Sequence, residues 1–152
     1  MTEPDRRAAF AAMTEALIAD FRAHGGAVTS GPFAGRSVLL LTTTGAQSGQ
    51  LRLAPLVYSR AGEHYVIVAS KGGAPTHPAW YHNPLAHPIV TVEVGAEKFE
   101  ARARVAEGAE RDRLFAQHSS ISPAFNDYQT RTSRVIPVVV LERLRDGDAI
   151  RN

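Results

Sequence analysis

The chain has 152 residues, of which 44% are hydrophobic and 21% charged, and its net charge is +2; these values are typical of one soluble globular domain. It contains no cysteine, which excludes disulfides, thiolate metal ligands and thiol nucleophiles. No apolar run reaches the length of a membrane span, and the N-terminus lacks the pattern of a signal peptide, so the expected compartment is the cytoplasm.

The charges are distributed unevenly along the chain. Between residues 31 and 88 the sole acidic residue is Glu63, against four basic residues: Arg36, Arg52, Arg60 and Lys71. A locally basic segment suits an anionic ligand. The basic residues are too sparse for a nucleic-acid-binding face, and no nucleic-acid partner is expected.

The N-terminal segment is predicted to form an amphipathic helix over residues 5–23. Thr2 with Asp5 resembles a capping box, and Gly25 and Gly26 would end the helix. Its apolar residues recur at three- and four-residue steps: Phe10, Met13, Leu17, Ile18 and Phe21. Glu15 offsets the arginines, so packing on the domain is favoured over a peripheral membrane contact. Residues 1–30 are therefore assigned to this helix and a linker, 31–145 to the main domain and 146–152 to a polar tail.

Apolar and β-branched runs predict six strands, at residues 37–44, 51–60, 63–69, 89–94, 98–106 and 135–141. The first three would form a meander. Pro137 interrupts the last run, which suggests an edge or bulge position. Two helices are predicted at 107–119 and 123–131. This order indicates a β-rich α+β domain, most simply a small barrel with helices packed outside.

A glycine turn follows the strand predicted at 63–69. Gly72 and Gly73 let the backbone approach a ligand without a Cβ in the way, and Lys71 places a cation beside their N–H groups. Pro78 then opens a short helical turn that carries Trp80 and Tyr81 with the amide of Asn83. The combination suggests a charged, planar ligand. The alternative interpretation is a plain turn, a surface lysine and a core tryptophan.

Other site types find less support. His77, His82 and His87 recur every five residues, a poor spacing for one helix face, and no carboxylate is close in sequence, so a metal site is not expected. A Gly-x-Ser-x-Gly elbow, a P-loop and a Gly-x-Gly-x-x-Gly fingerprint are all absent from the sequence. What remains is a pocket in which a bound cofactor carries the reaction.

Three segments carry a resemblance to a known family. Residues 43–56 (TTGAQSGQLRLAPL), residues 69–83 (ASKGGAPTHPAWYHN) and residues 127–139 (DYQTRTSRVIPVV) follow one another in the order and spacing of its signatures. The chain resembles the deazaflavin (coenzyme F420)-dependent nitroreductase and quinone reductase family between residues 33 and 141. The resemblance implies an FMN-binding-like split β-barrel that binds coenzyme F420, a deazaflavin with a phosphate and an oligoglutamate tail.

The family signatures also imply roles for individual residues. Four would hold the anionic part of the cofactor: Ser48, Gly49, Gln50 and Arg52. Three would lie along its ring system: Ala54, Pro55 and Leu56. Four would supply backbone and charge contacts: Ser70, Lys71, Gly72 and Gly73. Three would close the pocket: Trp80, Tyr81 and Asn83.

The implied reaction is hydride transfer from reduced F420 to a planar acceptor such as a quinone or a nitroaromatic. Tyr128 matches the family's substrate-side tyrosine, and its neutral phenol can donate a hydrogen bond at physiological pH. Two departures bear on the acceptor: Phe125 stands where many relatives have a second tyrosine, and Pro84 stands where leucine is common.

Two other functions stay open at this point. An oxidoreductase that uses flavin mononucleotide on the same barrel is one, and a non-catalytic lipid or cofactor carrier is the other. The sequence does not decide between a monomer and a homodimer.

Overall fold

A computed structural model describes residues 2–144; the predicted tail at 146–152 lies outside them. The helices are α1 (Glu3–Ala23), α2 (Ala79–Ala86), α3 (Gly108–Ile121) and α4 (Ala124–Thr130), with a short 3-10 turn η1 (Lys71–Gly73). The strands are β1 (Val38–Thr44), β2 (Leu51–Val57), β3 (Ser59–Ala61), β4 (His64–Val68), β5 (Ile89–Val94), β6 (Glu97–Val105) and β7 (Val138–Arg143). The predicted α+β class is confirmed.

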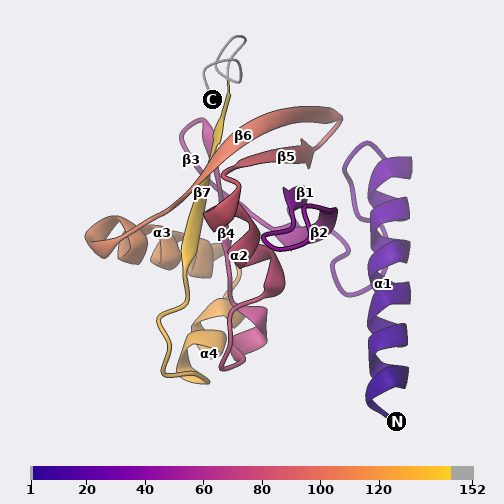
Figure 1. Ribbon diagram of the computed structural model, residues 1–152, viewed down its shortest axis with the longest axis horizontal. Coiled ribbons are helices and arrows are strands. Elements are labelled where there is room, and N and C mark those ends of the chain that lie inside the picture. The colour runs from indigo at the N-terminus through magenta and orange to yellow at the C-terminus, as the bar shows by residue number, and fades with distance from the viewer. Residues whose placement is uncertain (1, 145–152) are drawn as a thin grey trace.

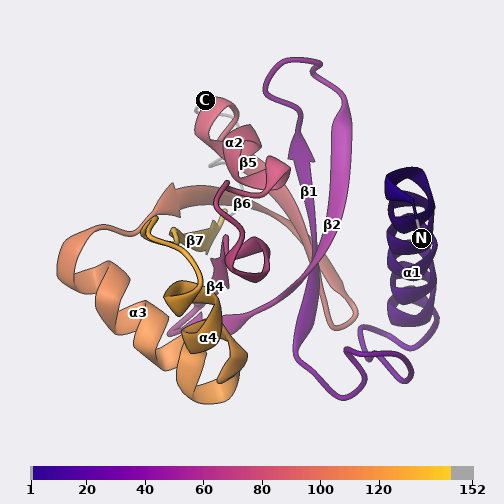
Figure 2. The same cartoon turned by 90° about the horizontal axis from the view of Figure 1, so that it is seen from below.

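The seven strands form one antiparallel sheet in the order β2-β1-β5-β6-β7-β4-β3. Its two edges, β2 and β3, are successive parts of one chain segment, separated by Tyr58 alone. Because both edges belong to the same short segment, the sheet has to curl round on itself into a split barrel, as Figure 2 shows. The split β-barrel expected from the family resemblance is confirmed.

The strand predicted at 51–60 is divided at Tyr58 into β2 and β3, and these two parts make the antiparallel pairings expected of the three-strand meander. Residues up to Val57 pair with β1, whereas Ser59 and the two residues after it pair with β4 at the other end of the sheet. At the change of partner the N–H of Tyr58 donates to the carbonyl of Ser37. The curl of the sheet therefore divides one run of β-forming residues between two ladders.

The expected edge position of the last strand is wrong. β7 lies inside the sheet, between β6 and β4. Pro137 precedes its first ladder residue, and the proline carbonyl accepts a hydrogen bond from the N–H of Ala69. The missing N–H of proline therefore removes no ladder hydrogen bond.

Alternate residues of the central strands pack into different clusters. The inner cluster lies within the curl and comprises Leu39, Leu41, Tyr65, Ile67, Val90, Val92, Val94, Phe99, Ala101, Ala103, Val139 and Leu141. The α3–α4 cluster covers the outer face of β4 and β7 and comprises Val66, Val68, Ala106, Leu114, Phe115, Phe125, Ile136, Val138 and Val140. The α1 cluster comprises Phe21, Val28, Val38 and Leu40. Both faces of β1, β4 and β7 are buried, which explains their continuous apolar runs.

Helix α1 stands beside β2 and extends past the sheet (Figure 1). The predicted capping box is present: the N–H of Asp5 donates to the hydroxyl of Thr2, and the carboxylate of Asp5 accepts from the N–H of Thr2. Phe21, near the C-terminal end, is 2% exposed, whereas Phe10 is 66% and Met13 39% exposed. Packing on the domain is thus confirmed for the C-terminal half alone. None of the described helices is long and apolar enough to cross a membrane.

A histidine is buried beneath α3. His118 is 1% exposed, and its Nδ1 lies 2.9 Å from the hydroxyl oxygen of Ser59 on β3. Its ring meets the ring of Phe125 edge to face, with centroids 4.4 Å apart. Burial lowers the pKa of His118 to about 4. The folded protein therefore holds this imidazole neutral and ties α3 to the edge strand β3 through it.

The buried imidazole predicts a pH-dependent stability. The folded pKa lies below the value of about 6.5 in an unfolded chain, so the stabilisation is complete above about pH 6.5 and is lost as the pH falls toward 4. The loss should approach about 3 kcal/mol. Urea unfolding between pH 4.5 and 7.5 measures it. In His118→Phe the free energy of unfolding should depend less steeply on pH, by the uptake of up to one proton. The slope should stay as in the wild type in His87→Gln, a substitution on the exposed surface. Equal slopes for the wild type and both variants would contradict the assignment.

Candidate functional site

The glycine turn after β4 has an unusual backbone. Lys71, Gly72 and Gly73 all have positive φ, at 47°, 63° and 82°. The N–H groups of Gly73 and Ala74 bond back to Ser70 and Lys71, whereas those of Lys71 and Gly72 donate to nothing within residues 2–144. Successive outward N–H groups in such a turn form an anion-binding concavity. The turn therefore fits a phosphate or carboxylate group.

The side chain of Lys71 adds a positive charge to this turn. Its Nζ lies 3.3 Å from the hydroxyl oxygen of Thr76, and it makes no ion pair within the described part of the chain. Ser70, just before it, is buried, while Lys71 and Gly72 are exposed. No carboxylate of the described residues therefore neutralises this ammonium, which can pair with an anionic ligand.

The two glycines of the turn have different surroundings. A Cβ at Gly72 would meet no atom within 4 Å, whereas one at Gly73 would lie 2.6 Å from the carbonyl oxygen of Tyr128 and 2.9 Å from the Cβ of Arg131. Helix α4 thus approaches the backbone of Gly73 closely, while the predicted approach of this backbone to a ligand stays a prediction. Only Gly72 presents its backbone to open space.

The second glycine loop connects β1 to β2 and is closed by its own hydrogen bonds. The N–H of Gly45 donates to Gln50 at 2.7 Å, that of Gly49 to Gly45 at 3.0 Å, and that of Gln50 to the hydroxyl of Ser48 at 3.1 Å. Ser48, Gly49 and Gln50 are all exposed, as is Arg52, which makes no ion pair within residues 2–144. The loop thus presents small polar groups and a nearby cation.

Asn83 ties this loop to α2. Its amide nitrogen donates to the hydroxyl of Thr43 at 2.9 Å, and its amide oxygen accepts from the N–H of Ala46 at 3.1 Å. The side chain is buried and both ends of its amide are engaged. Asn83 therefore positions the loop, and the two glycine loops lie at the two ends of one short helix (Figure 1).

The register of β2 decides which face of the sheet carries each residue that is expected along the cofactor ring. Ala54 pairs with Leu41 and Leu56 with Leu39, so both share the face of the inner cluster, where α2 packs. Arg52 pairs with Thr43 on that same face. Pro55 pairs with Leu40, so its side chain lies on the face of the α1 cluster and not on that of the inner cluster.

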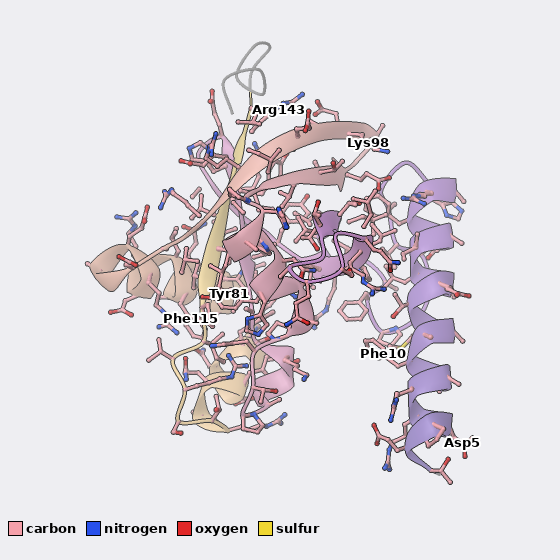
Figure 3. All side chains as sticks on the ribbon, in the orientation of Figure 1. Asp5, Phe10, Tyr81, Lys98, Phe115 and Arg143 are labelled. Atoms are coloured by element: carbon pink, nitrogen blue, oxygen red, sulfur yellow. The ribbon has the colours of Figure 1, made fainter. Side chains whose placement is uncertain are left out.

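The rings of α2 face the same cluster. Trp80 and Tyr81 are half-buried against it, and the ring of Tyr81 lies 4.8 Å from that of His77. Burial raises the pKa of Tyr81, so its phenol is neutral. Figure 3 shows Tyr81 between α2 and β7. A hollow of about 210 Å³ opens there, lined by Tyr81, Pro84, Leu85, Pro88, Ala103, Arg104, Val105 and Val139. Helix α2 continues through Pro84 to Ala86.

Tyr128 lies on α4, the helix that packs against the glycine turn. Its ring rests on the α3–α4 cluster, 5.2 Å from the ring of Phe125. Phe125 is buried between His118 and Tyr128, so this departure from the family pattern fills the core. Within residues 2–144 no three potential metal ligands come together.

The sequence pattern did not reveal Arg134 as a site residue. Its guanidinium donates to the carbonyls of Ala69, Ser70 and Ala74 and to Nδ1 of His77. These acceptors surround the glycine turn on both sides. The only sequence signal was the place of Arg134 in the third family segment.

The contrast between the two glycines predicts unequal stability losses. Gly72→Ala should lower the free energy of unfolding by about 1–2 kcal/mol, since alanine disfavours positive φ. Gly73→Ala adds a clash with the backbone of α4 and should cost about 2–4 kcal/mol. Urea unfolding of both variants measures the difference; equal losses would show that α4 does not constrain Gly73.

The chain is similar to known proteins of one described family. Residues 15–143 match the model of the F420H(2)-dependent quinone reductase family. An F420H(2)-dependent quinone reductase of Mycobacterium tuberculosis is 46% identical over 108 residues, which are 69% of this chain and 72% of the relative. A second, putative one from that organism is 34% identical over 103 residues, covering 68% and 87%.

Solved structures give the same result. An F420-H2 dependent reductase (FDR-A) superposes with a TM-score of 0.66 at 42% identity, over 70% of this chain and 95% of that one. A structure described as a domain-swapped dimer has the same score and identity and covers 70% and 81%. A pyridoxamine 5'-phosphate oxidase-like protein of Listeria innocua, at 13% identity and a TM-score of 0.53 over 86% and 93%, shares the fold alone. The chain thus belongs to the F420H(2)-dependent quinone reductase family, and it is an oxidoreductase whose cofactor is coenzyme F420.

Proposed function

We propose that the chain reduces a quinone with reduced coenzyme F420, and that the Lys71–Gly73 turn binds the anionic part of the cofactor. The observation that carries this assignment is the exposed left-handed turn, in which the N–H groups of Lys71 and Gly72 lack partners within residues 2–144 and the Lys71 ammonium, bonded to the hydroxyl of Thr76, makes no ion pair there. A phosphate or carboxylate would satisfy both N–H groups at once. The Arg52 guanidinium and the exposed Ser48 supply further donors at the other loop, where the N–H of Gly49 is already bonded to Gly45.

The ring system is assigned to the face shared by β2 and α2. Ala54 and Leu56 are small or flexible enough to border a flat ring, and Trp80 and Tyr81 offer aromatic faces for it. These side chains also exclude water from one side of the ring. Bound reduced F420 supplies a hydride, and the quinone takes up that hydride and one proton to become a hydroquinone.

Tyr128 is assigned to the acceptor side. Its helix packs against the glycine turn, so the phenol belongs to the same neighbourhood as the cofactor loop. A neutral phenol can orient a quinone oxygen by donating a hydrogen bond. Nitroaromatics are the second acceptor class, because a nitro oxygen can accept the same hydrogen bond.

Binding of the cofactor can be tested with the protein's one tryptophan. Trp80 is the sole tryptophan, so its fluorescence reports on the proposed ring site. Oxidised F420 should quench it saturably, while flavin mononucleotide and a fatty acid should not. Quenching by the flavin alone would favour the flavin enzyme, and quenching by the fatty acid alone would favour a carrier. Anaerobic oxidation of reduced F420 by menadione then measures turnover; binding without turnover would reject the reductase assignment.

A relative's assembly bears on the oligomeric state of the chain. The domain-swapped relative at 42% identity supports a homodimer for this chain, and the exposed Phe10 and Met13 of α1 offer apolar surface to a second copy. Light scattering across a concentration series distinguishes the dimer from a monomer. The cytoplasm stays a prediction from sequence.

Lys71→Ala should weaken F420 binding about ten- to a hundred-fold, the usual range for losing a hydrogen bond to a charged group. The affinity of the wild-type protein should also fall as salt rises, because exposed charges are screened. Fluorescence titrations at several ionic strengths measure both effects. Lys98→Ala, near the start of β6, is the matched control and should leave binding unchanged. An affinity independent of salt would contradict the assigned anionic contact.

Tyr128→Phe should leave F420 affinity and stability nearly unchanged, because the ring and its packing on Phe125 are kept. It should lower kcat/KM about 10²-fold, which is the lower range for a positioned proton donor. Steady-state rates with several quinones and nitroaromatics measure the loss. Full turnover with every acceptor would show that the hydroxyl has no chemical role.

A further inference from the structure

We propose that Arg134 is the positioning residue of the cofactor loop: it holds the Lys71–Gly73 turn in its binding conformation without itself touching the cofactor. The inference rests on the proposed function for the identity of the ligand. It concerns a residue to which neither the sequence pattern nor the family resemblance assigned a role.

The guanidinium of Arg134 spans the loop that contains the turn. Its Nε donates to the carbonyl of Ala74 at 2.8 Å, and Nη2 donates to the carbonyl of Ser70 at 2.6 Å. Nη1 donates to the carbonyl of Ala69 at 3.1 Å and to Nδ1 of His77 at 3.0 Å. The acceptors lie on both sides of the turn in sequence, so one rigid group fixes where the turn begins and where it ends.

The turn needs such a constraint because its backbone is strained. Lys71 is the sole non-glycine residue with positive φ among the described residues, at 47°, a conformation that is unfavourable for an L-residue because its Cβ crowds the backbone. Strained backbone persists only where its surroundings over-determine it. Arg134 supplies that constraint by bonding the carbonyls of Ser70 and Ala74, the two residues that flank the 3-10 turn.

Only an arginine can make this set of hydrogen bonds. The guanidinium has five N–H donors in one rigid plane, whereas a lysine ammonium is a point charge that cannot span the same acceptors. Arg134 can donate but not accept, so Nδ1 of His77 must be the acceptor and the ring must be neutral. Burial, with the nearby charges of Arg134 and His82, lowers the pKa of His77 in agreement with this state.

The charge of Arg134 also favours an anion at the turn. Its partners are three carbonyls and a neutral imidazole, and it makes no ion pair with a carboxylate within residues 2–144. Its positive charge therefore adds to that of Lys71 at the turn. A half-buried cation without a counter-ion raises the local potential for an anionic ligand.

The backbone carbonyl of Arg134 is held by Gln129. The amide oxygen of Gln129 accepts from the N–H of Ile136 as well as from a second arginine, Arg111, so Gln129 keeps a partner when Arg111 is replaced. The amide of Gln129 donates to the carbonyl of Arg134 at 2.8 Å, and its oxygen accepts from Nη2 of Arg111 at 2.9 Å. Arg111 also donates to the carbonyl of Ile136, which precedes β7. Arg111 therefore braces the same segment but has no contact with the loop, so Arg111→Met serves as the matched control.

The test combines local hydrogen exchange of the cofactor-free protein with F420 titration. Arg134→Met should speed exchange of amides in residues 69–77 and weaken F420 binding about tenfold or more. The KM for reduced F420 should rise, while kcat at saturating cofactor stays near the wild-type value. Arg111→Met should leave exchange in 69–77 and F420 affinity unchanged, even at a matched loss of thermal stability.

Two further variants separate geometry from charge. Arg134→Lys keeps the positive charge but loses the planar set of N–H donors, and its affinity for F420 should fall nearly as much as that of Arg134→Met. Arg134→Ala should recover affinity when guanidinium is added to the solution, a readout that applies even if the methionine variant folds poorly. Wild-type affinity in Arg134→Lys, or equal losses in Arg111→Met and Arg134→Met, would overturn the positioning role. Failure of the wild-type protein to bind F420 would instead contradict the proposed function. In that case, faster amide exchange in residues 69–77 of Arg134→Met would still support the positioning role of Arg134.

Discussion

The structure depends on one constraint: the central strands of the curled sheet are buried on both faces. Alternate residues of β1, β4 and β7 pack either into the inner cluster or against an outer helix. The outer faces must therefore be covered, by α1 on one side and by α3 with α4 on the other, as Figure 2 shows. With both sheet faces committed to packing, polar functional groups are left to the loops at the strand ends and to α2, where the inner cluster meets solvent. This is the ordinary division between a rigid scaffold and functional loops.

The two loops of the site are held by side chains from elsewhere in the chain. Asn83 fixes the β1–β2 loop to α2, and Arg134 encloses the turn after β4. In both cases a half- or fully buried polar side chain satisfies backbone groups that the local loop geometry leaves unpaired. Such ties stabilise the site because an unpaired buried carbonyl or N–H is costly. The exposed groups of the same loops, at Ser48, Gly49, Lys71 and Gly72, are then available for a ligand.

The cations of the site differ from several arginines elsewhere on the surface. Elsewhere several arginines are paired with acids: Arg104 bonds to Glu110 and Glu142, Arg22 to Glu93 and Arg143 to Glu97. The bonds from Glu110 and Glu142 raise the pKa of Arg104 further above its usual range. Lys71, Arg52 and Arg134 make no ion pair within residues 2–144. Unpaired cations around an acid-poor segment match a cofactor that carries phosphate and carboxylate groups.

The sequence by itself determined the local elements, the family and the acid-poor segment. The capping box at Thr2, the strand at 89–94 and the glycine turn were all readable because capping, alternation and positive φ depend on neighbouring residues. Only the tertiary structure decided which strands pair, so residues 51–60 were divided and Pro137 came to precede an interior strand. It also decided that Gly73 meets α4 and that Arg134 clamps a loop 57 to 65 residues away. These contacts join residues far apart in the chain, and no local pattern records them because the curl of the whole sheet brings them together.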